Sequence, residues 1–466
     1  MQSLTFRFRQ HDGPLYDQLY RRLADGIRSG EIHAGEKLPS KRRLAADLGV
    51  SVNTVDTAYG MLAAEGYVGS RPRSGFVVCR LDTLPAPPPA VSPAATEPPA
   101  RRWRYDFETA AIDTGLFPFK AWRRIQQDVL AGDPSLLNHG HRQGDLPLRR
   151  AIATHLMEYR AVRCTPEQVV VGAGIEYLLG MLARMFCTRV FAVENPGYAR
   201  TARILGNNGV QVRCLPVDHA GLSVTALAQS DAQIAYVTPS HQFPTGVTMP
   251  AARRYELLRW AEAAPDRYLI EDDYDSEFRF DRRPLPCLQG MDGAGRVIYI
   301  GTFSKSLAPA FRVAYMVLPP RLLTRWQAEF GFYSCTVSRY EQATLARFMS
   351  DGHFARHLNR LRIAYHRRRD LLMEELLRQL GPVRLSGTHT GLHLLLTMPE
   401  TCSEQQLVQA AAARDVRCNG LSAYDLDASL PEGPATVVLG YAGLSDSDIV
   451  PAVAALREAW GPFLRS

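Results

Sequence analysis

A run rich in proline and alanine, LDTLPAPPPAVSPAATEPPARRW, is the feature that most constrains how this chain can fold. It spans residues 81–103 and holds seven prolines and five alanines, with almost no side chain able to build a core. Proline favours the extended polyproline II conformation, so such a run behaves as a semi-rigid spacer. We therefore expect an N-terminal domain over residues 1–80, a linker over residues 81–103 and a larger domain over residues 104–466. A proline-rich ligand for another protein is the alternative interpretation of the run.

The N-terminal domain carries most of the chain's excess positive charge. Residues 1–80 contain twelve Lys and Arg against eight Asp and Glu, which supplies +4 of the net charge of +7. A basic surface attracts nucleic acid phosphates. Double-stranded DNA is therefore the expected partner of this domain, and a basic interaction module that never touches DNA is the alternative.

Apolar spacing predicts three short helices in this domain. A stripe from Leu15 to Ile27, repeating every four residues, predicts a first helix that ends near Ser29 and Gly30. Ser40 is placed to cap a second helix over residues 41–48, and Ser51 or Asn53 a third. The piece GSRPRSGFVV then reads as a β-hairpin with arginines at its tip. Two helices joined by a glycine-containing turn and followed by such a hairpin predict a winged helix-turn-helix.

The segment LPSKRRLAADLGVSVNTVDTAYGMLAAEGYV resembles the winged helix-turn-helix of the GntR family of bacterial transcription regulators. This resemblance implies a recognition helix over residues 51–65 in the major groove and a wing that reaches toward the minor groove. Val52 stands where the family often has arginine, which implies apolar readout at that position or none. The residues that the resemblance places near DNA are Ser40, Lys41, Arg42, Arg43, Ser51, Asn53, Thr54, Arg71 and Arg73.

In residues 104–466 short apolar runs alternate with helical stretches. Such alternation predicts an α/β domain with a mainly parallel sheet and helices on both faces, whose ligands bind at strand ends. From about residue 320 onward the chain is helical, over residues 340–380, and then α+β, which predicts a smaller C-terminal lobe. The expected strands are residues 169–171, 190–193, 210–215, 234–237, 268–270, 297–300 and 313–318.

The stretch GTFSKSLAPAFR follows one of these expected strands and presents a lysine among hydroxyls and a nearby cation. Lys305 has the surroundings that a Schiff base to a phosphorylated aldehyde needs, although a solvated loop lysine is the ordinary alternative. Thr302, Ser304 and Arg312 are candidates to receive the phosphate, the arginine as a bidentate clamp.

Four other strand ends carry groups that suit the same cofactor. Asp272 and Tyr274 are two residues apart, so they face one way in an extended backbone while Asp273 faces the other. A carboxylate there would hold a pyridinium N–H, and a phenol would donate to the adjacent ring oxygen. VVVGAGIEYL leads from a strand through Gly174 to a helix beginning near Ile175, whose amides can bind phosphate. The runs TPSHQFPTG and ENPGYAR, the second with Tyr198 and Arg200, occupy two more strand ends, and no spacing predicts a metal site.

The runs TPSHQFPTG, IEDDYDSEF and GTFSKSL resemble the fold type I pyridoxal-phosphate enzymes of the aspartate aminotransferase group. Joined to a GntR-type domain by a proline linker, the whole chain resembles the MocR/GabR-type regulators. This resemblance implies a head-to-tail homodimer and pyridoxal 5'-phosphate as cofactor, with the internal aldimine on Lys305. It assigns Asp272 to the pyridine nitrogen, Tyr274 to the ring hydroxyl, Tyr198 to the ring, the phosphate to Arg312, Thr302 and the amides of Gly174 and Ile175, and an effector contact to Arg200.

Two positions depart from the pattern of these proteins. His139 stands where they usually have a tyrosine that reaches the partner's phosphate. Gly443 stands where GABA-responsive relatives and aminotransferases carry an arginine for the substrate carboxylate. The loss of that charge-assisted contact, of order 1.5–3 kcal/mol, argues against ordinary turnover and against a GABA effector.

These observations predict a cytoplasmic DNA-binding transcription regulator that senses an amine, an amino acid or pyridoxal phosphate itself. A working aminotransferase with a vestigial DNA-binding domain is the alternative. The chain has no run of about 18 apolar residues and its start lacks the apolar core of a signal peptide, so we expect neither a membrane span nor export. Its eight scattered cysteines are expected to be reduced.

Overall fold

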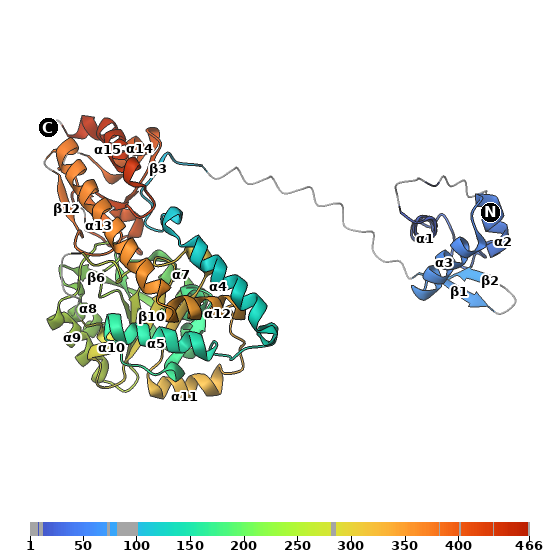
Figure 1. Ribbon diagram of the computed structural model, residues 1–466, viewed down its shortest axis with the longest axis horizontal. Coiled ribbons are helices and arrows are strands. Elements are labelled where there is room, and N and C mark those ends of the chain that lie inside the picture. Colours follow the sequence, from blue (N-terminus) through green and yellow to red (C-terminus); the bar gives the residue numbers. More distant parts are fainter. Residues whose placement is uncertain are drawn as a thin grey trace. The chain divides into compact units, whose positions relative to one another are not determined.

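The computed structural model describes residues 8, 13–71, 75–81, 101–280, 286–381, 383–399, 402–431 and 433–464. The chain divides into two compact units, Met1–Ala100 and Arg101–Ser466 (Figure 1). Each unit has its own hydrophobic core. The division falls in the segment expected to be a linker, of which residues 82–100 lie outside the described part of the chain. Within the described residues, every helix is too short or too polar to cross a bilayer.

The smaller unit is the predicted winged helix-turn-helix. Helices α1 (Leu15–Arg28), α2 (Lys41–Leu48) and α3 (Val52–Ala64) precede a hairpin of β1 (Val68–Arg71) and β2 (Gly75–Val78). The hydroxyl oxygens of Ser40 and Ser51 accept hydrogen bonds from backbone amides three residues on, so both serines cap helices as expected. Leu15, at the start of α1, is 43% exposed, so this end of the predicted apolar stripe was wrong.

The larger unit is built on the predicted, mainly parallel sheet. Its strand order is β4-β11-β10-β9-β8-β5-β6-β7, in which β10, β9, β8, β5 and β6 run parallel and β11 is antiparallel to both neighbours. Each strand expected from the apolar runs is present. The bounds are β4 Val169–Gly172, β5 Val190–Asn195, β6 Gln211–Asp218, β7 Gly221–Leu222, β8 Ile234–Val237, β9 Tyr268–Asp273, β10 Val297–Thr302 and β11 Ala314–Val317.

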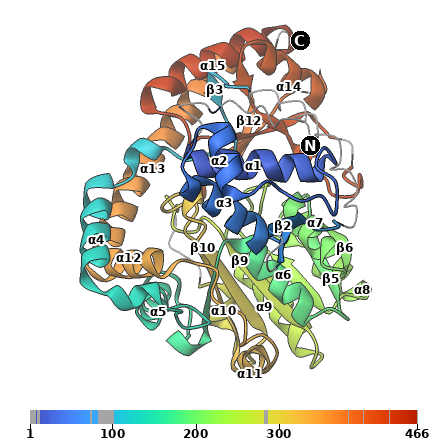
Figure 2. The ribbon, with the colours of Figure 1, turned by 90° about the vertical axis from the view of Figure 1, so that its right-hand side faces the viewer.

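Helices cover both faces of this sheet because alternate strand residues point to opposite sides. Along β10, Ile298 and Ile300 pack in the cluster beneath α6, α7 and α11, whereas Tyr299 packs against α4, α5 and α12 (Figure 2). Helices α8, α9 and α10 cover the remainder of the second face. The bounds are α4 Phe119–Gly132, α5 Leu146–Arg160, α6 Ile175–Met185, α7 Ala199–Asn207, α8 Val224–Gln229, α9 Ala251–Glu262, α10 Leu288–Met291, α11 Pro320–Glu329 and α12 Arg339–Ser350.

The C-terminal lobe is α+β, as predicted. A four-stranded antiparallel sheet of order β12-β13-β16-β15 packs with α13, α14 and α15. The helix expected over residues 340–380 is two helices, because Gly352 adopts a left-handed φ of 72° between α12 and α13. The bounds are β12 Arg384–Ser386, β13 His393–Thr397, β15 Asn419–Gly420, β16 Thr436–Gly440, α13 His353–Leu380, α14 Glu404–Ala413 and α15 Asp446–Trp460.

One further strand pair ties the start of the larger unit to this lobe. Strand β3 (Tyr105–Asp106), close after the expected linker, pairs in parallel with β14 (Val416–Arg417). The first residues of the larger unit are therefore part of its fold.

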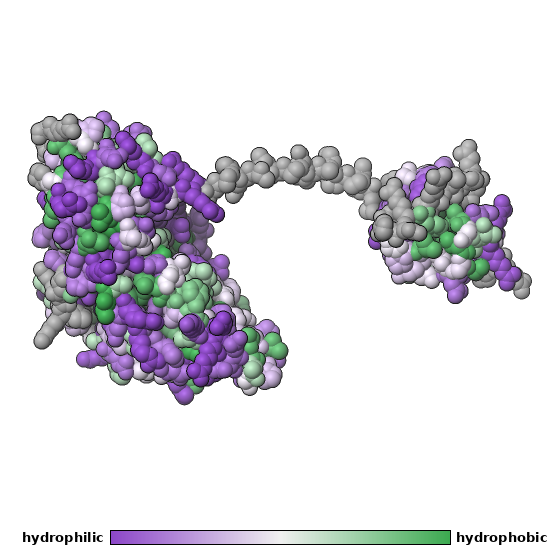
Figure 3. Space-filling view, turned by 45° about the horizontal axis from the view of Figure 1, so that its top comes forward, coloured by the Kyte–Doolittle hydropathy of each residue, from purple (hydrophilic) through white to green (hydrophobic). Residues whose placement is uncertain are grey.

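The visible face of the larger unit is mainly hydrophilic, as expected when the apolar faces of its elements are turned into the core clusters (Figure 3).

Candidate functional site

A cavity of about 210 Å³ lies where the parallel strands β9 and β10 end at their carboxyl termini. The register pairs Ile300 with Asp272, so the loop that follows β10 and the last residues of β9 reach the same edge of the sheet. Every residue that sequence reasoning placed at the cofactor or effector lines this cavity, except Gly174, which precedes the lining residue Ile175. The cavity lining is Thr109, Ala110, Ile175, Glu176, Tyr198, Arg200, Thr238, Phe243, Asp272, Tyr274, Asp275, Thr302, Ser304, Lys305, Pro309, Arg312, Leu392 and His393.

The amine of Lys305 projects into this cavity from the turn after β10. Its Nζ donates a hydrogen bond to the backbone carbonyl oxygen of Thr109. Burial lowers the pKa of Lys305 to about 8, although the negative charges of Asp275 and Glu108 act in the opposite direction. A larger share of this lysine than of an exposed lysine is therefore neutral, and nucleophilic, near neutral pH.

The carboxylate of Asp272 has an unsatisfied oxygen. Its Oδ2 accepts a hydrogen bond from the Tyr236 hydroxyl, while Oδ1 is buried without a hydrogen-bond partner among the described residues. Burial raises the pKa of Asp272 to about 7, because the charged carboxylate lacks water, and the hydrogen bond from Tyr236 offsets this only in part. A cationic N–H donor is what Oδ1 lacks, and the nitrogen of a protonated pyridine ring fits that requirement.

Asp273 points to the opposite side of β9, away from the cavity. Its Oδ2 accepts hydrogen bonds from Arg160 Nε at 2.6 Å and from the Tyr299 hydroxyl at 2.6 Å. Burial raises the pKa of Asp273, but the charge of Arg160 and these hydrogen bonds together hold it below its ordinary value. This buried ion pair anchors the end of β9, which carries Asp272 and is followed directly by Tyr274.

Hydroxyls, helix amides and an arginine surround one end of the cavity. Thr302 Oγ1 and Ser304 Oγ lie 2.8 Å apart, and α6 begins at Ile175 after Gly174, whose φ is 89°. Glycine suits this position because an L side chain rarely adopts a φ of 89°, and a Cβ would also displace the Arg312 guanidinium, 2.2 Å away. This set of donors at a helix N-terminus fits a phosphate group.

Glu176 places a carboxylate in the same donor set, which sequence reasoning missed. Its Oε2 accepts a hydrogen bond from Arg312, and its Oε1 lies 4.0 Å from Nη1 of Arg200. Partial burial raises the pKa of Glu176, but the hydrogen bond and charge of Arg312 contribute to a net lowering. A bound phosphate and Glu176 would therefore compete for Arg312.

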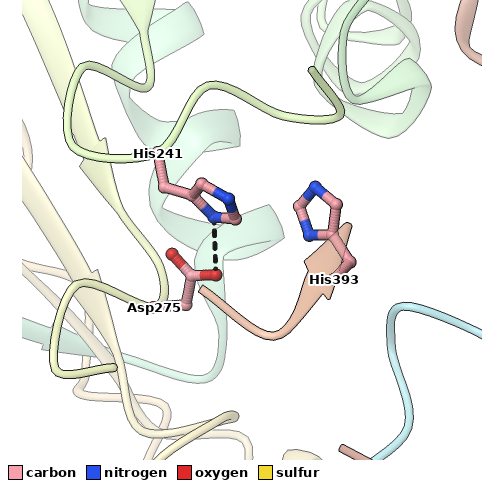
Figure 4. Close-up of side chains that lie close together, drawn as sticks. All are labelled: His241, Asp275 and His393. Carbon is pink, nitrogen blue, oxygen red and sulfur yellow. Dashed lines mark hydrogen bonds and ion pairs between the residues drawn. The ribbon is translucent and has the colours of Figure 1, made fainter. Parts of the chain in front are cut away.

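Tyr274 is held by a buried histidine, His241, which in turn contacts the carboxylate of Asp275; Figure 4 shows the histidine and the carboxylate. Nδ1 of His241 lies 2.9 Å from Asp275 Oδ2 and 3.0 Å from the Tyr274 hydroxyl. Metal-binding atoms of His241, Asp275 and His393 lie within 4.8 Å of one another. Nδ1 of His241 and Oδ2 of Asp275 are already engaged with one another, and the charge of Lys305 acts on His393. We therefore ascribe the cluster to hydrogen bonding, and the expectation of no metal stays a prediction.

The first residues of the larger unit form one wall of the cavity. Thr109 and Ala110 line it, and this segment passes directly over two glycines of the C-terminal lobe. A Cβ at Gly440 would lie 2.7 Å from Thr109 Cα, and a Cβ at Gly443 would lie 2.6 Å from the Cβ of Ala111. The position at which the resemblance implies a missing arginine, Gly443, is therefore closed by the wall.

The expected DNA-contacting residues occupy the exposed side of the smaller unit's second and third helices. Ser51 and Asn53 are exposed at the start of α3, as are Ser40, Arg42 and Arg43 at the start of α2. Lys41 forms an ion pair with Asp56, and Thr54 Oγ1 lies 2.8 Å from Ser51 Oγ. Arg71 ends β1, but its side chain and the whole of Arg73 lie outside the described residues.

His139 is exposed and lines a second cavity, of about 550 Å³, with Asp145 and Arg339. It does not line the cavity of Lys305. Its expected role toward a partner's phosphate stays a prediction. All eight cysteines are free thiols, as expected.

Local sequence signals explain only some of the residues that were missed. Thr238, Phe243 and Asp275 belong to runs that were recognised as strand ends, so they could have been included. Thr109, Ala110, Leu392 and His393 come from distant parts of the chain with no local signal. Only the packing of the C-terminal lobe brings them to the cavity.

Two family models match the two units. The model described as bacterial regulatory proteins, gntR family, matches residues 15–78, and the model described as aminotransferase class I and II matches residues 109–456. The uncharacterized HTH-type transcriptional regulator YdeL of Bacillus subtilis is 40% identical to this chain over 99% of this chain and 100% of its own length. The probable rhizopine catabolism regulatory protein MocR of Rhizobium meliloti is 34% identical over 97% of this chain and 95% of its own length.

A solved structure shares the fold of the larger unit. The kynurenine aminotransferase of Pyrococcus horikoshii, crystallised in complex with PMP, is 24% identical and superposes with a TM-score of 0.68 over 78% of this chain and 91% of its own. This likeness extends over almost the whole of the aminotransferase.

Proposed function

Because this chain belongs to the MocR-type transcriptional regulators, which join a GntR-family domain to a class I and II aminotransferase domain, we propose that it regulates transcription by sensing a small amine or amino acid at Lys305. Its cofactor is pyridoxal 5'-phosphate. The observation that carries the proposal is the single cavity that gathers Lys305, Asp272 and Arg312 in a chain with a helix-turn-helix.

The residues of the cavity suit that cofactor part by part. Oδ1 of Asp272 would accept a hydrogen bond from the ring nitrogen, and Tyr198 would lie against the ring. Arg312, Thr302, Ser304 and the first amides of α6 would hold the phosphate, in competition with Glu176 for the arginine. When bound, the cofactor supplies an aldehyde that condenses with primary amines, which is the chemistry by which an amine would be sensed.

A change in the protonation or position of Lys305 can be transmitted to the start of the larger unit. Its ammonium group donates to the carbonyl of Thr109, and Tyr105, four residues earlier, begins the strand that follows the expected linker. When Lys305 loses its proton or is drawn elsewhere, this carbonyl loses a charged donor. We propose that the resulting shift of the segment changes how the two DNA-binding domains of a head-to-tail homodimer are held. An effector acts only as far as it binds the two arrangements with different affinity.

The closed wall at Gly443 favours a sensor over a catalyst. Ala111 occupies the space beside Gly443, so a carboxylate clamp has no room there. An aminotransferase stays the second candidate, because the cavity still contains Lys305, Asp272 and Tyr274.

A panel of primary amines and amino acids tests this proposal on the full chain loaded with cofactor. We expect at least one amine to change both the visible absorbance of the cofactor and the affinity for operator DNA, with no repeated conversion of an added keto acid. Repeated turnover would instead establish the aminotransferase. A DNA affinity that responds to cofactor loading alone, and to no amine, would make pyridoxal phosphate the signal.

Arg42 is the residue of the second helix best placed to contact DNA phosphates. It is exposed and has no ion-pair partner among the described residues, whereas Lys41 pairs with Asp56. We expect Arg42→Ala to weaken DNA binding and to lower the slope of log affinity against log salt by about 0.9, the share of one phosphate contact. Arg21→Ala, which removes an exposed arginine of α1, is the matched control. Equal salt slopes for the two variants would contradict this contact.

The expected cytoplasmic location and homodimer belong to the same proposal.

A further inference from the structure

Resting on the proposed function, we infer that His241, oriented by Asp275, is a positioning residue that makes the Tyr274 hydroxyl a strong hydrogen-bond donor toward the cofactor's ring oxygen. His241 and Asp275 are each 1% exposed. They come from different elements: His241 from the turn after β8 and Asp275 from the chain just after β9 (Figure 4). No sequence motif links these two positions, which are 34 residues apart, so only the folded structure reveals their contact.

The hydrogen bonds determine which nitrogen of His241 carries the proton. The Tyr274 hydroxyl lies 3.0 Å from the backbone carbonyl oxygen of His241, which can only accept, so the phenol proton points there. Nδ1 of His241 lies 2.9 Å from Oδ2 of Asp275 and 3.0 Å from the Tyr274 oxygen. Both contacts are satisfied when Nδ1 carries a hydrogen, because the phenol oxygen and the carboxylate oxygen can each accept it. Nε2 is then the acceptor nitrogen, and it has no hydrogen-bond partner among the described residues.

Packing holds the imidazole in this orientation. A Cβ at Gly391, whose φ is 76°, would lie 1.9 Å from Cε1 of His241, so the ring fits against bare backbone. The ring of His393 lies on another side, with ring centroids 4.6 Å apart. Nε2 of His393 lies 2.9 Å from the Pro244 carbonyl, and burial keeps the pKa of His393 well below its ordinary value, so His393 is neutral. His241 therefore has no room to turn Nδ1 away from Tyr274.

The consequence for Tyr274 follows from hydrogen-bond polarisation. A phenol whose oxygen accepts an N–H becomes a better donor through its own O–H. Tyr274 lines the cavity of Lys305, and its single hydroxyl proton would turn from the His241 carbonyl to the ring oxygen when the cofactor binds, while Nδ1 of His241 continues to donate to the phenol oxygen. A stronger donor stabilises that oxygen as an anion and lowers the proton affinity of the group conjugated with it. His241 thus tunes, through Tyr274, the pH at which the bound cofactor changes its protonation state.

Other titratable groups also face this region, and each stays unchanged in the variants below. Lys305 projects from the turn after β10, and His393 from β13. Asp272 and Tyr236 come from β9 and β8, Glu194 from β5, and Glu108 from the segment after the linker. A difference between variants therefore reports the change at position 241 or 274.

The test is the pH midpoint of the cofactor's visible absorbance in the full chain. We expect His241→Gln, which removes the donor at Nδ1, to raise this midpoint by about 0.5–1 pH unit, the effect of one weakened hydrogen bond. His241→Asn places its amide nitrogen near the position of Nδ1 and should restore most of the wild-type midpoint. Tyr274→Phe should itself raise the midpoint, and adding His241→Gln to it should cause no further shift.

The outcomes separate this inference from the proposed function. Equal shifts for His241→Gln with and without Tyr274, or no shift at all, would overturn the positioning role. A His241→Asn variant that behaves like His241→Gln would do the same. If the wild-type chain showed no pyridoxyl group on Lys305 after borohydride reduction, the cofactor site itself would fail. Should His241→Gln fail to fold, His241→Ala, which also removes the donor at Nδ1, should show the same rise in the midpoint with Tyr274 and no further rise with Tyr274→Phe, and the absence of that dependence would overturn the positioning role.

Discussion

Replacement of Lys305 by alanine is expected to abolish covalent trapping of pyridoxal phosphate. In the wild-type chain, borohydride reduction and peptide mass mapping should find close to one pyridoxyl group per chain, on the peptide that contains Lys305. In Lys305→Ala the group should be absent, because no other lysine lines the cavity formed by the described residues. The effect is complete loss, which makes it the largest functional change that we expect.

The trapping should also depend on pH in a way set by the lysine. Only the neutral amine attacks an aldehyde, and the pKa of Lys305 is lowered to about 8 by burial. About one lysine in ten is then neutral at pH 7 and about half at pH 8, so the initial trapping rate should rise through this range and level off above it. Lys120→Ala, which removes an exposed lysine of α4, should leave both the amount and the pH profile unchanged. Labelling that persists in Lys305→Ala would move the site elsewhere.

Replacement of Arg160 by methionine should cause the largest loss of stability. The Arg160 and Asp273 side chains are 4% and 1% exposed, and Nε donates to Oδ2 at 2.6 Å. Without the arginine, Asp273 becomes a buried charge with no cation, which costs about 3–5 kcal/mol. Arg160 also donates to Ser240 in the turn after β8, so the same change loosens the turn that carries His241.

Tryptophan fluorescence during urea unfolding measures this loss in the larger unit alone, because all five tryptophans lie beyond residue 100. Arg325→Ala, which breaks the exposed pair with Glu329, should change the unfolding free energy by less than about 1 kcal/mol. The double variant Arg160→Met with Asp273→Leu should recover part of the stability, since neither partner is left charged. A single variant as stable as the wild type would show that the pair contributes little. The tryptophans are Trp103, Trp122, Trp260, Trp326 and Trp460.

Much of the fold was predictable because its strands are buried on both faces. Continuous apolar runs such as residues 297–300 have few alternatives to a central parallel strand, and polar residues follow where such strands end. The capping serines of the smaller unit were equally predictable, because Ser40 and Ser51 each stand directly before the first residue of a helix. Gly352 was available in the sequence as a signal for the break between α12 and α13, and it was overlooked.

The parts of the site that were missed depend on contacts between distant segments. Glu176 reads as an ordinary first-turn helix acid, and only the arrival of Arg312 from 136 residues away reveals its partner. His393 lies within an apolar strand, and its neighbours come from the turns after β8 and β9. Local secondary-structure propensity contains no information about such contacts, because the packing of the C-terminal lobe against the sheet determines them.

The two glycines beneath residues 108–111 bear on how this chain can evolve. Any side chain at Gly440 or Gly443 meets the wall at less than 3 Å, so a single substitution cannot rebuild an arginine clamp in place. The wall would have to retreat at the same time, and with it the carbonyl that Lys305 contacts. A change at either glycine alone is therefore blocked by the wall. Any relative that carries an arginine clamp at this place should also differ in the segment that forms the wall.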